Sequence, residues 1–425
     1  MEELRIERLG QRGEGIARTA KGPVYVPHAL AGEIVLAEVA GERGLLVEIL
    51  QPSSDRIAPF CPYYGICGGC AVQTLAPATY ADWKRGLLLD ALRHAGLSPL
   101  DSDPALVGPL VDAHGLGRRR ATFHARFAAS GPAKVGFMQA RAHEVIDLDA
   151  CPILAPAMQG APAIAHKLAA ALGAARKPLD IAVTATLTGL DIDLRGHGPL
   201  DPRETRALTR VAESEDLARI ANHGARVIER RAPLLRIGRA EVAPPPGAFL
   251  QATQAGEEAL ADKVCAALAG ARRIADLFAG LGTFSLRLAE KARVHAVDSE
   301  GAELEALAKA ARSTPGLLDV TVETRDLFVR PLAIAELNAF DAVVFDPPRA
   351  GAEAQARTLA ASAVPLVAAV SCNIQSFCRD AALLTAGGYA LESVTPIDQF
   401  RYSPHLEIVG IFRRTKARRP RRLLG

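Results

Sequence analysis

The stretch from Ile274 to Leu286 constrains the fold of this chain more than any other part of the sequence. It reads Ile-Ala-Asp-Leu-Phe-Ala-Gly-Leu-Gly-Thr-Phe-Ser-Leu, so a short apolar run is followed by Asp276, by a loop with two glycines and by an apolar-periodic helix. A strand, a glycine turn and a helix in this order let a ligand lie against bare backbone at the carboxyl end of a parallel strand. The stretch therefore predicts a parallel α/β sheet with a binding site at its edge.

The acidic residues around this loop indicate which ligand the edge would receive. Asp298 ends the next apolar run and lies 22 residues after Asp276, which is close to the ~20-residue spacing at which a carboxylate receives ribose hydroxyls. The loop has the pattern Asp-x-x-x-Gly-x-Gly and lacks the Gly-x-Gly-x-x-Gly of a pyrophosphate-binding loop. A nucleoside without phosphates fits better, so the pattern favours S-adenosylmethionine.

The chain of 425 residues is long enough for two or three domains, since ~100–200 residues per domain is usual. Close-spaced short strands in residues 1–55 predict a small β-barrel of the kind that commonly binds oligonucleotides. Residues 56–243 predict a central α+β domain, and residues 244–425 predict a Rossmann-like domain that ends in an antiparallel strand pair. The fold class is therefore α/β with two accessory domains.

Charge and targeting signals restrict the partners of the chain. The net charge of +3 is too small to argue for nucleic acid, but arginines cluster at residues 118–120, at residues 226–239 and in the tail at residues 413–422. No apolar run of membrane-spanning length and no charged-then-apolar leader is found, so we expect a cytoplasmic protein without a membrane partner. No obligate protein partner is implied.

Four of the seven cysteines form a candidate metal site. Cys61, Cys67 and Cys70 lie within ten residues together with three glycines, and Cys151 is the only other cysteine in the first half of the chain. Seven cysteines in a leaderless chain indicate metal binding or catalysis rather than disulfides. Thiolates suit zinc or an iron–sulfur cluster, and the Cys-x5-Cys-x2-Cys spacing differs from paired zinc knuckles, so an iron–sulfur cluster is favoured.

Further strand ends in the last domain carry the groups for chemistry. Asp326 and Asp346 follow apolar runs, and Asp346 is followed by Pro-Pro-Arg, whereas amino-group methyltransferases have an aromatic residue after a similar Pro-Pro. Cys372 ends the next strand and precedes a helix. Because a helix N-terminus lowers the pKa of a thiol, we expect Cys372 to be a nucleophile.

Taken together, these segments resemble the RNA (uracil-5-)-methyltransferases, specifically the 23S ribosomal-RNA branch that carries an N-terminal TRAM barrel and an iron–sulfur cluster. The resemblance covers nearly the whole chain. It rests on the barrel, the four cysteines, Phe249-Leu-Gln-Ala-Thr253, the Asp276 loop, Asp346-Pro-Pro-Arg349, Ser371-Cys-Asn373 and His405-Leu-Glu407. The chain departs from the family where Thr283 replaces a frequent Asn and Asp298 replaces a frequent Glu.

The resemblance implies a role for each residue. Cys372 would be the nucleophile and Glu407 the general base. A 4Fe–4S cluster would be bound by Cys61, Cys67, Cys70 and Cys151. The S-adenosylmethionine site would be formed by Gln251, Phe278, Thr283, Asp298, Asp326 and Asp346.

These roles make chemical sense, because uracil C5 is too weak a nucleophile to take a methyl group directly. Addition of the Cys372 thiolate to C6 makes C5 nucleophilic, and a base must then remove the C5 proton so that the thiolate leaves. The pyrimidine must leave its stack to reach both groups. The transfer is redox-neutral, so the cluster is expected to have a structural or RNA-docking role. Two alternatives stay open, a transfer-RNA target and a non-catalytic iron–sulfur RNA-binding protein.

Overall fold

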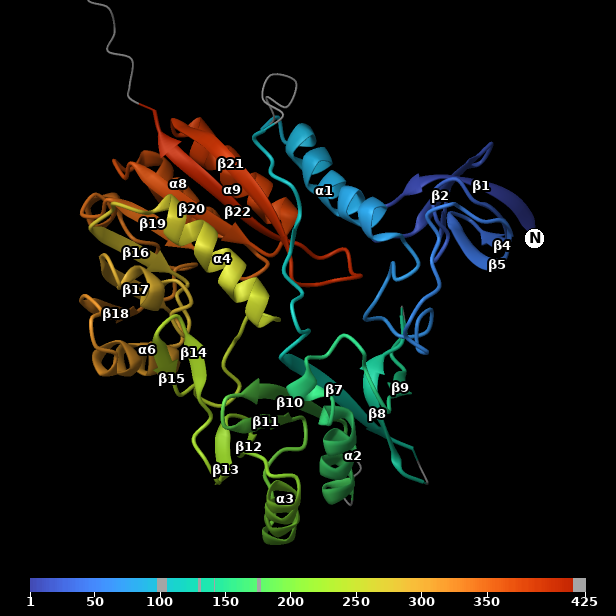
Figure 1. Ribbon diagram of the computed structural model, residues 1–425, viewed down its shortest axis with the longest axis horizontal. Coiled ribbons are helices and arrows are strands. Elements are labelled where there is room, and N and C mark those ends of the chain that lie inside the picture. Colours follow the sequence, from blue (N-terminus) through green and yellow to red (C-terminus); the bar gives the residue numbers. More distant parts are fainter. Residues whose placement is uncertain (98–104, 129–130, 141, 174–176, 416–425) are drawn as a thin grey trace, which may run out of the picture.

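The computed structural model describes residues 1–97, 105–128, 131–140, 142–173 and 177–415 (Figure 1). The chain forms a closed barrel, a seven-stranded sheet and an eight-stranded sheet. Figure 1 shows the barrel in blue, the seven-stranded sheet mainly in green and strands β16 to β22 of the eight-stranded sheet in yellow to red, with helix α1 between the barrel and the eight-stranded sheet. Residues 416–422 of the basic tail lie outside the described residues.

The predicted small barrel at the N-terminus is confirmed. Its strands close in the order β1-β2-β3-β5-β4, and alternate side chains such as Leu4, Ile6 and Val35 fill the interior. This alternation follows from the two-residue period of a strand, which sends successive side chains to opposite faces. The strands are β1 (Glu2–Leu9), β2 (Gly15–Thr19), β3 (Gly22–Val26), β4 (Ile34–Ala40) and β5 (Arg43–Gln51).

The seven-stranded sheet has the order β13-β12-β11-β10-β7-β8-β9, and helices α2 and α3 pack against it. The core between sheet and helices includes Phe123, Ile181, Leu168 and Leu208. The elements are β7 (Arg120–Phe127), β8 (Ala133–Met138), β9 (Val145–Asp147), a 3-10 helix (Pro156–Met158), α2 (Ala161–Ala171), β10 (Leu179–Thr186), β11 (Gly189–Arg195), α3 (Pro202–Ser214), β12 (Arg219–Asn222) and β13 (Ala225–Glu229).

The eight-stranded sheet is the predicted Rossmann-like sheet, with the order β18-β17-β16-β19-β20-β22-β21-β6. Strands β16 to β20 are parallel, and β22 runs antiparallel between β20 and β21, which confirms the predicted closing pair. The strands are β6 (Val111–Asp112), β16 (Arg273–Leu277), β17 (Arg293–Asp298), β18 (Val320–Thr324), β19 (Ala342–Phe345), β20 (Leu366–Ser371), β21 (Tyr389–Asp398) and β22 (Glu407–Arg414).

Helices cover both faces of this sheet, because its central strands are apolar on both sides. Val343 and Phe345 of β19 face the core that contains α9 and α1, whereas Ala342 and Val344 face the core that contains α4. The helices are α4 (Gln254–Ala267), α5 (Ser285–Leu288), α6 (Gly301–Ser313), α7 (Ile334–Leu337), α8 (Glu353–Ala361) and α9 (Ile374–Ala386), and the hairpin β14 (Leu235–Ile237) and β15 (Ala240–Val242) packs beside α6.

Helix α1 (Pro77–His94) connects the barrel to the eight-stranded sheet. Leu88 and Leu92 enter the core of the sheet, and the Trp83 indole donates a hydrogen bond to the carbonyl of Gly10 in the barrel at 3.1 Å. The barrel is therefore tied to the sheet edge that carries the candidate site. Among the helices that the structure describes, none is long and apolar enough to cross a membrane.

Candidate active site

The glycine loop after β16 is shaped by close backbone packing. Phe278, Gly280 and Gly282 all have positive φ angles, of 61°, 51° and 89°. A side chain at position 282 would come within 2.3 Å of Leu307 on α6, so only glycine fits there. The loop therefore packs closely against α6 at the carboxyl end of β16.

Three of the predicted donor-binding residues gather beside this loop. The carboxylate of Asp298 accepts the backbone amides of Gly280 at 2.8 Å and of Glu300 at 3.0 Å, which fixes it at the end of β17. Asp326 accepts the amide of Phe328 at 2.9 Å, and the Phe328 ring lies 5.4 Å from that of Phe278. Each carboxylate oxygen keeps a lone pair for a further donor. Thr283, at the end of the same loop, is half-buried.

Gln251 and Asp346 form a second group, next to the predicted nucleophile and base. The Gln251 carboxamide donates to Asp346 at 3.0 Å. Asp346 follows β19, and its neighbour Phe345 pairs with Ala369 of β20. The sheet thus brings Asp346 beside the end of β20, where Cys372 lies.

Cys372 and Glu407 lie opposite each other at the end of an antiparallel strand pair. Ser371 of β20 pairs with Ile408 of β22, and Cys372 and Glu407 are the adjacent residues in that register. Glu407 also pairs with Ile397 of β21. The two residues therefore share one edge of the sheet, 35 positions apart in sequence.

The environment of Glu407 makes it a stronger base than an exposed carboxylate. Its side chain is 2% exposed, and burial raises its pKa to about 7, although a hydrogen bond from Gln399 and the charges of Arg349 and Lys84 act in the opposite direction. A pKa near the operating pH is the value at which a general base is most effective.

The expectation that the helix N-terminus would lower the pKa of Cys372 is wrong for the isolated protein. Burial, and then the negative charges of Glu407 and Asp346, raise the pKa of this thiol to about 11, although the charge of Arg349 and a backbone hydrogen bond act in the opposite direction. The amides at the start of α9 are occupied elsewhere, because the Asn373 side chain accepts from Gln375 at 2.9 Å and from Ser376 at 3.1 Å. The helix N-terminus is therefore capped by Asn373 and not by the thiolate.

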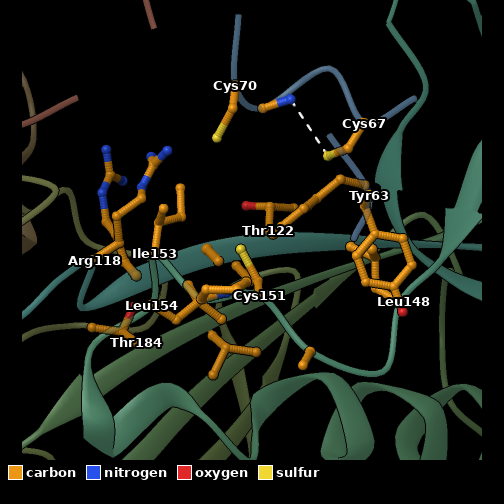
Figure 2. Close-up of a pocket in the computed structure, with 18 of the residues that line it drawn as sticks. Tyr63, Cys67, Cys70, Arg118, Thr122, Leu148, Cys151, Ile153, Leu154 and Thr184 are labelled. Atoms are coloured by element: carbon orange, nitrogen blue, oxygen red, sulfur yellow. Dashed lines mark hydrogen bonds between the residues drawn. The ribbon is translucent and has the colours of Figure 1, made fainter. Parts of the chain in front are cut away.

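The four candidate metal-binding cysteines line one cavity of about 390 Å³ between the loop at residues 61–70 and the seven-stranded sheet. Figure 2 shows Cys67 and Cys70 on one side and Cys151 on the other, with Arg118 beside them. Backbone bonds from Gly68 to Met138 and from Ala140 to Ile66 fix the loop to the end of β8. In the described part of the chain, no three His, Cys, Asp or Glu side chains are grouped closely enough to hold a single metal ion.

The arginine cluster at residues 118–120 is divided between two environments. Arg119 forms an ion pair with Glu257 of α4, and Glu257 also pairs with Arg287 of α5. Arg119 directly precedes β7, so its ion pair joins the seven-stranded sheet to a helix of the eight-stranded sheet. Arg118 and Arg120 line the cavity of the cysteines, and the Arg120 guanidinium lies 4.3 Å from the Phe249 ring centroid.

Three residues of the site were missed by the sequence analysis. Lys84 and Gln399 are both fully buried, and Phe328 faces Phe278. A signal existed for Lys84, since it lies on the same helical stripe as Tyr80, Leu88 and Leu92. Phe328 follows a strand-end Asp by two residues, whereas no local pattern distinguishes Gln399.

Comparison with known proteins gives both sequence and structural matches. The family described as tRNA (Uracil-5-)-methyltransferase matches residues 317–416. An uncharacterized RNA methyltransferase of Rhizobium meliloti (strain 1021) is 44% identical and covers 95% of this chain and 97% of its own. The 23S rRNA (uracil(1939)-C(5))-methyltransferase RlmD of Halomonas elongata is 33% identical and covers 95% of this chain and 88% of its own.

A solved structure shares the overall fold. The Pyrococcus abyssi tRNA (uracil-54, C5)-methyltransferase, in complex with S-adenosyl-L-homocysteine, matches with a TM-score of 0.71 and 20% sequence identity. The match covers 96% of this chain and 99% of that one.

Proposed function

Because the chain belongs to the S-adenosylmethionine-dependent RNA (uracil-5-)-methyltransferases, we propose that it methylates C5 of a uridine in 23S ribosomal RNA. We also propose that Cys372 is the nucleophile and Glu407 the general base. The observation that carries this mechanism is the position of the two residues opposite each other across β20 and β22.

The residues around the glycine loop fit the methyl donor. Asp298 would accept the ribose hydroxyls, the Phe278 and Phe328 rings would contact the adenine, and Asp326 would accept from it. Thr283, Gln251 and Asp346 would complete the site. The Asp298 carboxylate, which the backbone amides of Gly280 and Glu300 fix at the end of β17, supports this assignment. S-adenosylmethionine supplies an electrophilic methyl group on a sulfonium.

The protein side chains would act in two stages on the flipped uracil. The Cys372 sulfur forms a bond to C6, the C5–C6 electrons move toward O4, and C5 then takes the methyl group. Glu407 next removes the proton from C5, the C5–H electrons form the C5–C6 double bond again, and the C6–sulfur bond breaks to restore the thiolate. Since the pKa of Cys372 is raised in the isolated protein, the thiol must lose its proton as the substrates bind, and Arg349 favours the thiolate.

The ribosomal target is supported by the name of the Halomonas relative, which is 33% identical and has comparable length. The name of the Pyrococcus protein raises a transfer-RNA target, but its 20% identity supports a common fold alone. The test below distinguishes the two targets, because it compares fluorinated ribosomal RNA with fluorinated transfer RNA.

The cysteine cavity favours a 4Fe–4S cluster bound by Cys61, Cys67, Cys70 and Cys151 over a single zinc ion. Zinc needs four ligands within about 2.3 Å of one point, whereas these thiols surround a cavity. The guanidinium of Arg118 would offset the charge of the bound thiolates. The cluster would fix the loop at residues 61–70 and take no part in methyl transfer.

A trap with 5-fluorouridine tests the proposed reaction. Fluorine at C5 cannot be removed as a proton, so the wild-type protein with the methyl donor and a fluorinated 23S fragment is expected to form a stable adduct through Cys372, detected by mass spectrometry. The Cys372→Ala variant should form none, whereas the matched Cys378→Ala variant, which changes a buried thiol on α9, should react like wild type.

Three results would contradict the proposal. An adduct on fluorinated transfer RNA but not on the ribosomal fragment would assign the other target. No adduct on either RNA would favour a non-catalytic binding protein. An adduct that persists in Cys372→Ala would place the nucleophile elsewhere.

A further inference from the structure

We propose that Gln399 is a positioning residue for the general base: its carboxamide holds one oxygen of Glu407 and leaves the other free to take the C5 proton. This inference rests on the proposed function, in which Glu407 removes that proton. Gln399 lies at the start of the turn at residues 399–406, which joins β21 to β22.

The two carboxylate oxygens of Glu407 have different surroundings. Oε1 accepts a hydrogen bond from the Gln399 amide nitrogen at 2.9 Å. Oε2 is buried and has no hydrogen-bond partner among the residues that the structure describes. A buried polar atom without a partner is costly and rare in proteins, so it indicates a group whose partner arrives with the substrate.

The Gln399 carboxamide is itself held from three sides. Its oxygen accepts the backbone amide of Thr253 at 3.3 Å, and its nitrogen donates to Gln251 at 2.6 Å as well as to Glu407. Only this orientation satisfies all three partners, because a flipped amide would place oxygen against oxygen at Gln251 and Glu407. Gly256 makes the fit possible, since a side chain there would lie 2.6 Å from the Gln399 oxygen.

The turn that carries Gln399 is held at both ends by one buried lysine. The Lys84 ammonium pairs with Asp398 and donates to the carbonyls of Phe400 at 3.2 Å and His405 at 2.6 Å. The Tyr80 hydroxyl donates to the second oxygen of Asp398 at 2.6 Å. Because both ends of the turn are fixed to α1, Gln399 and Glu407 keep a constant separation.

This arrangement assigns Gln399 to one stage of the reaction. Gln399 contacts the base and the donor-site residue Gln251 but not the thiol, so at saturating methyl donor its loss is expected to slow the release that follows proton removal far more than it slows adduct formation. A displacement of about 1 Å can slow an enzyme roughly 10²-fold, and we expect a loss of that order in the release step.

Gln399→Met tests the proposal, because methionine has a similar volume and cannot donate a hydrogen bond. On fluorinated RNA with saturating methyl donor, where thiol addition and methyl transfer occur but proton removal cannot, the variant should form the adduct at close to the wild-type rate. On ordinary RNA with the methyl donor, the covalent adduct should accumulate and 5-methyluridine should form about 10²-fold more slowly. Gln399→Asn, which keeps the amide but withdraws it by one methylene, should show the same split.

The pH dependence of release gives a readout that a merely structural role would not move. The hydrogen bond from Gln399 lowers the pKa of Glu407, so its loss should shift the acid limb of the release rate to higher pH. Other charged or titratable groups also lie near Glu407, namely Asp346, Arg349, Lys84 and Cys372. These groups are the same in the variant and in the wild type, so the shift reports the lost hydrogen bond.

The control is Gln355→Met, since Gln355 on α8 is also buried but its carboxamide oxygen accepts the backbone amide of Leu332, in the loop before α7. The proposal is overturned if Gln399→Met and Gln399→Asn release product at the wild-type rate, or if they lose adduct formation and release in parallel. Failure of the wild-type protein to form an adduct would instead overturn the proposed function.

Discussion

The backbone amide of Ala71 donates a hydrogen bond of 2.7 Å to the carbonyl of Tyr402. The amide of Val72 donates to the same oxygen at 3.2 Å, and Tyr402 has the positive φ angle of 66° that few non-glycine residues adopt. Ala71 directly follows Cys70, and Tyr402 lies in the turn before Glu407. The cysteine loop is thus attached to the turn that carries the candidate base.

This attachment predicts that loss of the cysteine site loosens the turn. In Cys70→Ser we expect faster amide hydrogen exchange in residues 68–72 and 400–406, because the bonds to Tyr402 depend on the position of the loop. Exchange measured by mass spectrometry in the barrel strands should stay unchanged and provides the control. Equal exchange in the turn of variant and wild type would contradict the prediction.

Burial of Glu407 predicts a pH-dependent cost in stability. Its pKa rises from 4.5 to about 7 on folding, so unfolding releases a proton between these values and stability falls as pH rises through this window. Glu407→Gln removes this dependence. We expect the variant to be more stable than wild type at pH 8 by on the order of 2 kcal/mol, and close to wild type at pH 4.5. Thermal unfolding at both pH values checks this, and an equal difference at both would disprove it.

The buried ion pair between Lys84 and Asp398 predicts a large loss in Lys84→Met. Removal of one partner leaves a buried charge uncompensated and typically costs about 3–5 kcal/mol. Arg93→Ala on the same helix is the matched control, because its pair with Asp90 is exposed and worth less than about 1 kcal/mol. Urea unfolding should separate the two variants clearly, and similar midpoints would contradict the prediction.

The pair of Phe278 and Phe328 predicts weaker donor binding in Phe328→Ala. Loss of one aromatic contact of about 0.5–1.5 kcal/mol should raise the KM for S-adenosylmethionine by up to about 10-fold and leave kcat at saturation nearly unchanged. Val329→Ala alters the exposed neighbour and should have no effect. A fall in kcat with unchanged KM would show that Phe328 acts on another step.

Several features of the fold follow from sequence alone. Apolar runs with a strand or helix period predicted the barrel, the Rossmann-like sheet and its antiparallel end. Because parallel strands end at the same edge of a sheet, the order of the strand-end residues Asp298, Asp326, Asp346 and Cys372 was enough to place them on one rim.

Tertiary structure decided what surrounds these residues. The raised pKa of Cys372 depends first on burial and then on Glu407, which the β20–β22 register brings opposite it. The position of Gln399 depends on Lys84, more than 300 residues earlier in the chain. The local pattern of apolar residues determines which segments form helices or strands and in what order these follow along the chain. Burial, neighbouring charges and hydrogen-bond partners arise between segments that are distant along the chain, so only the folded structure determines them.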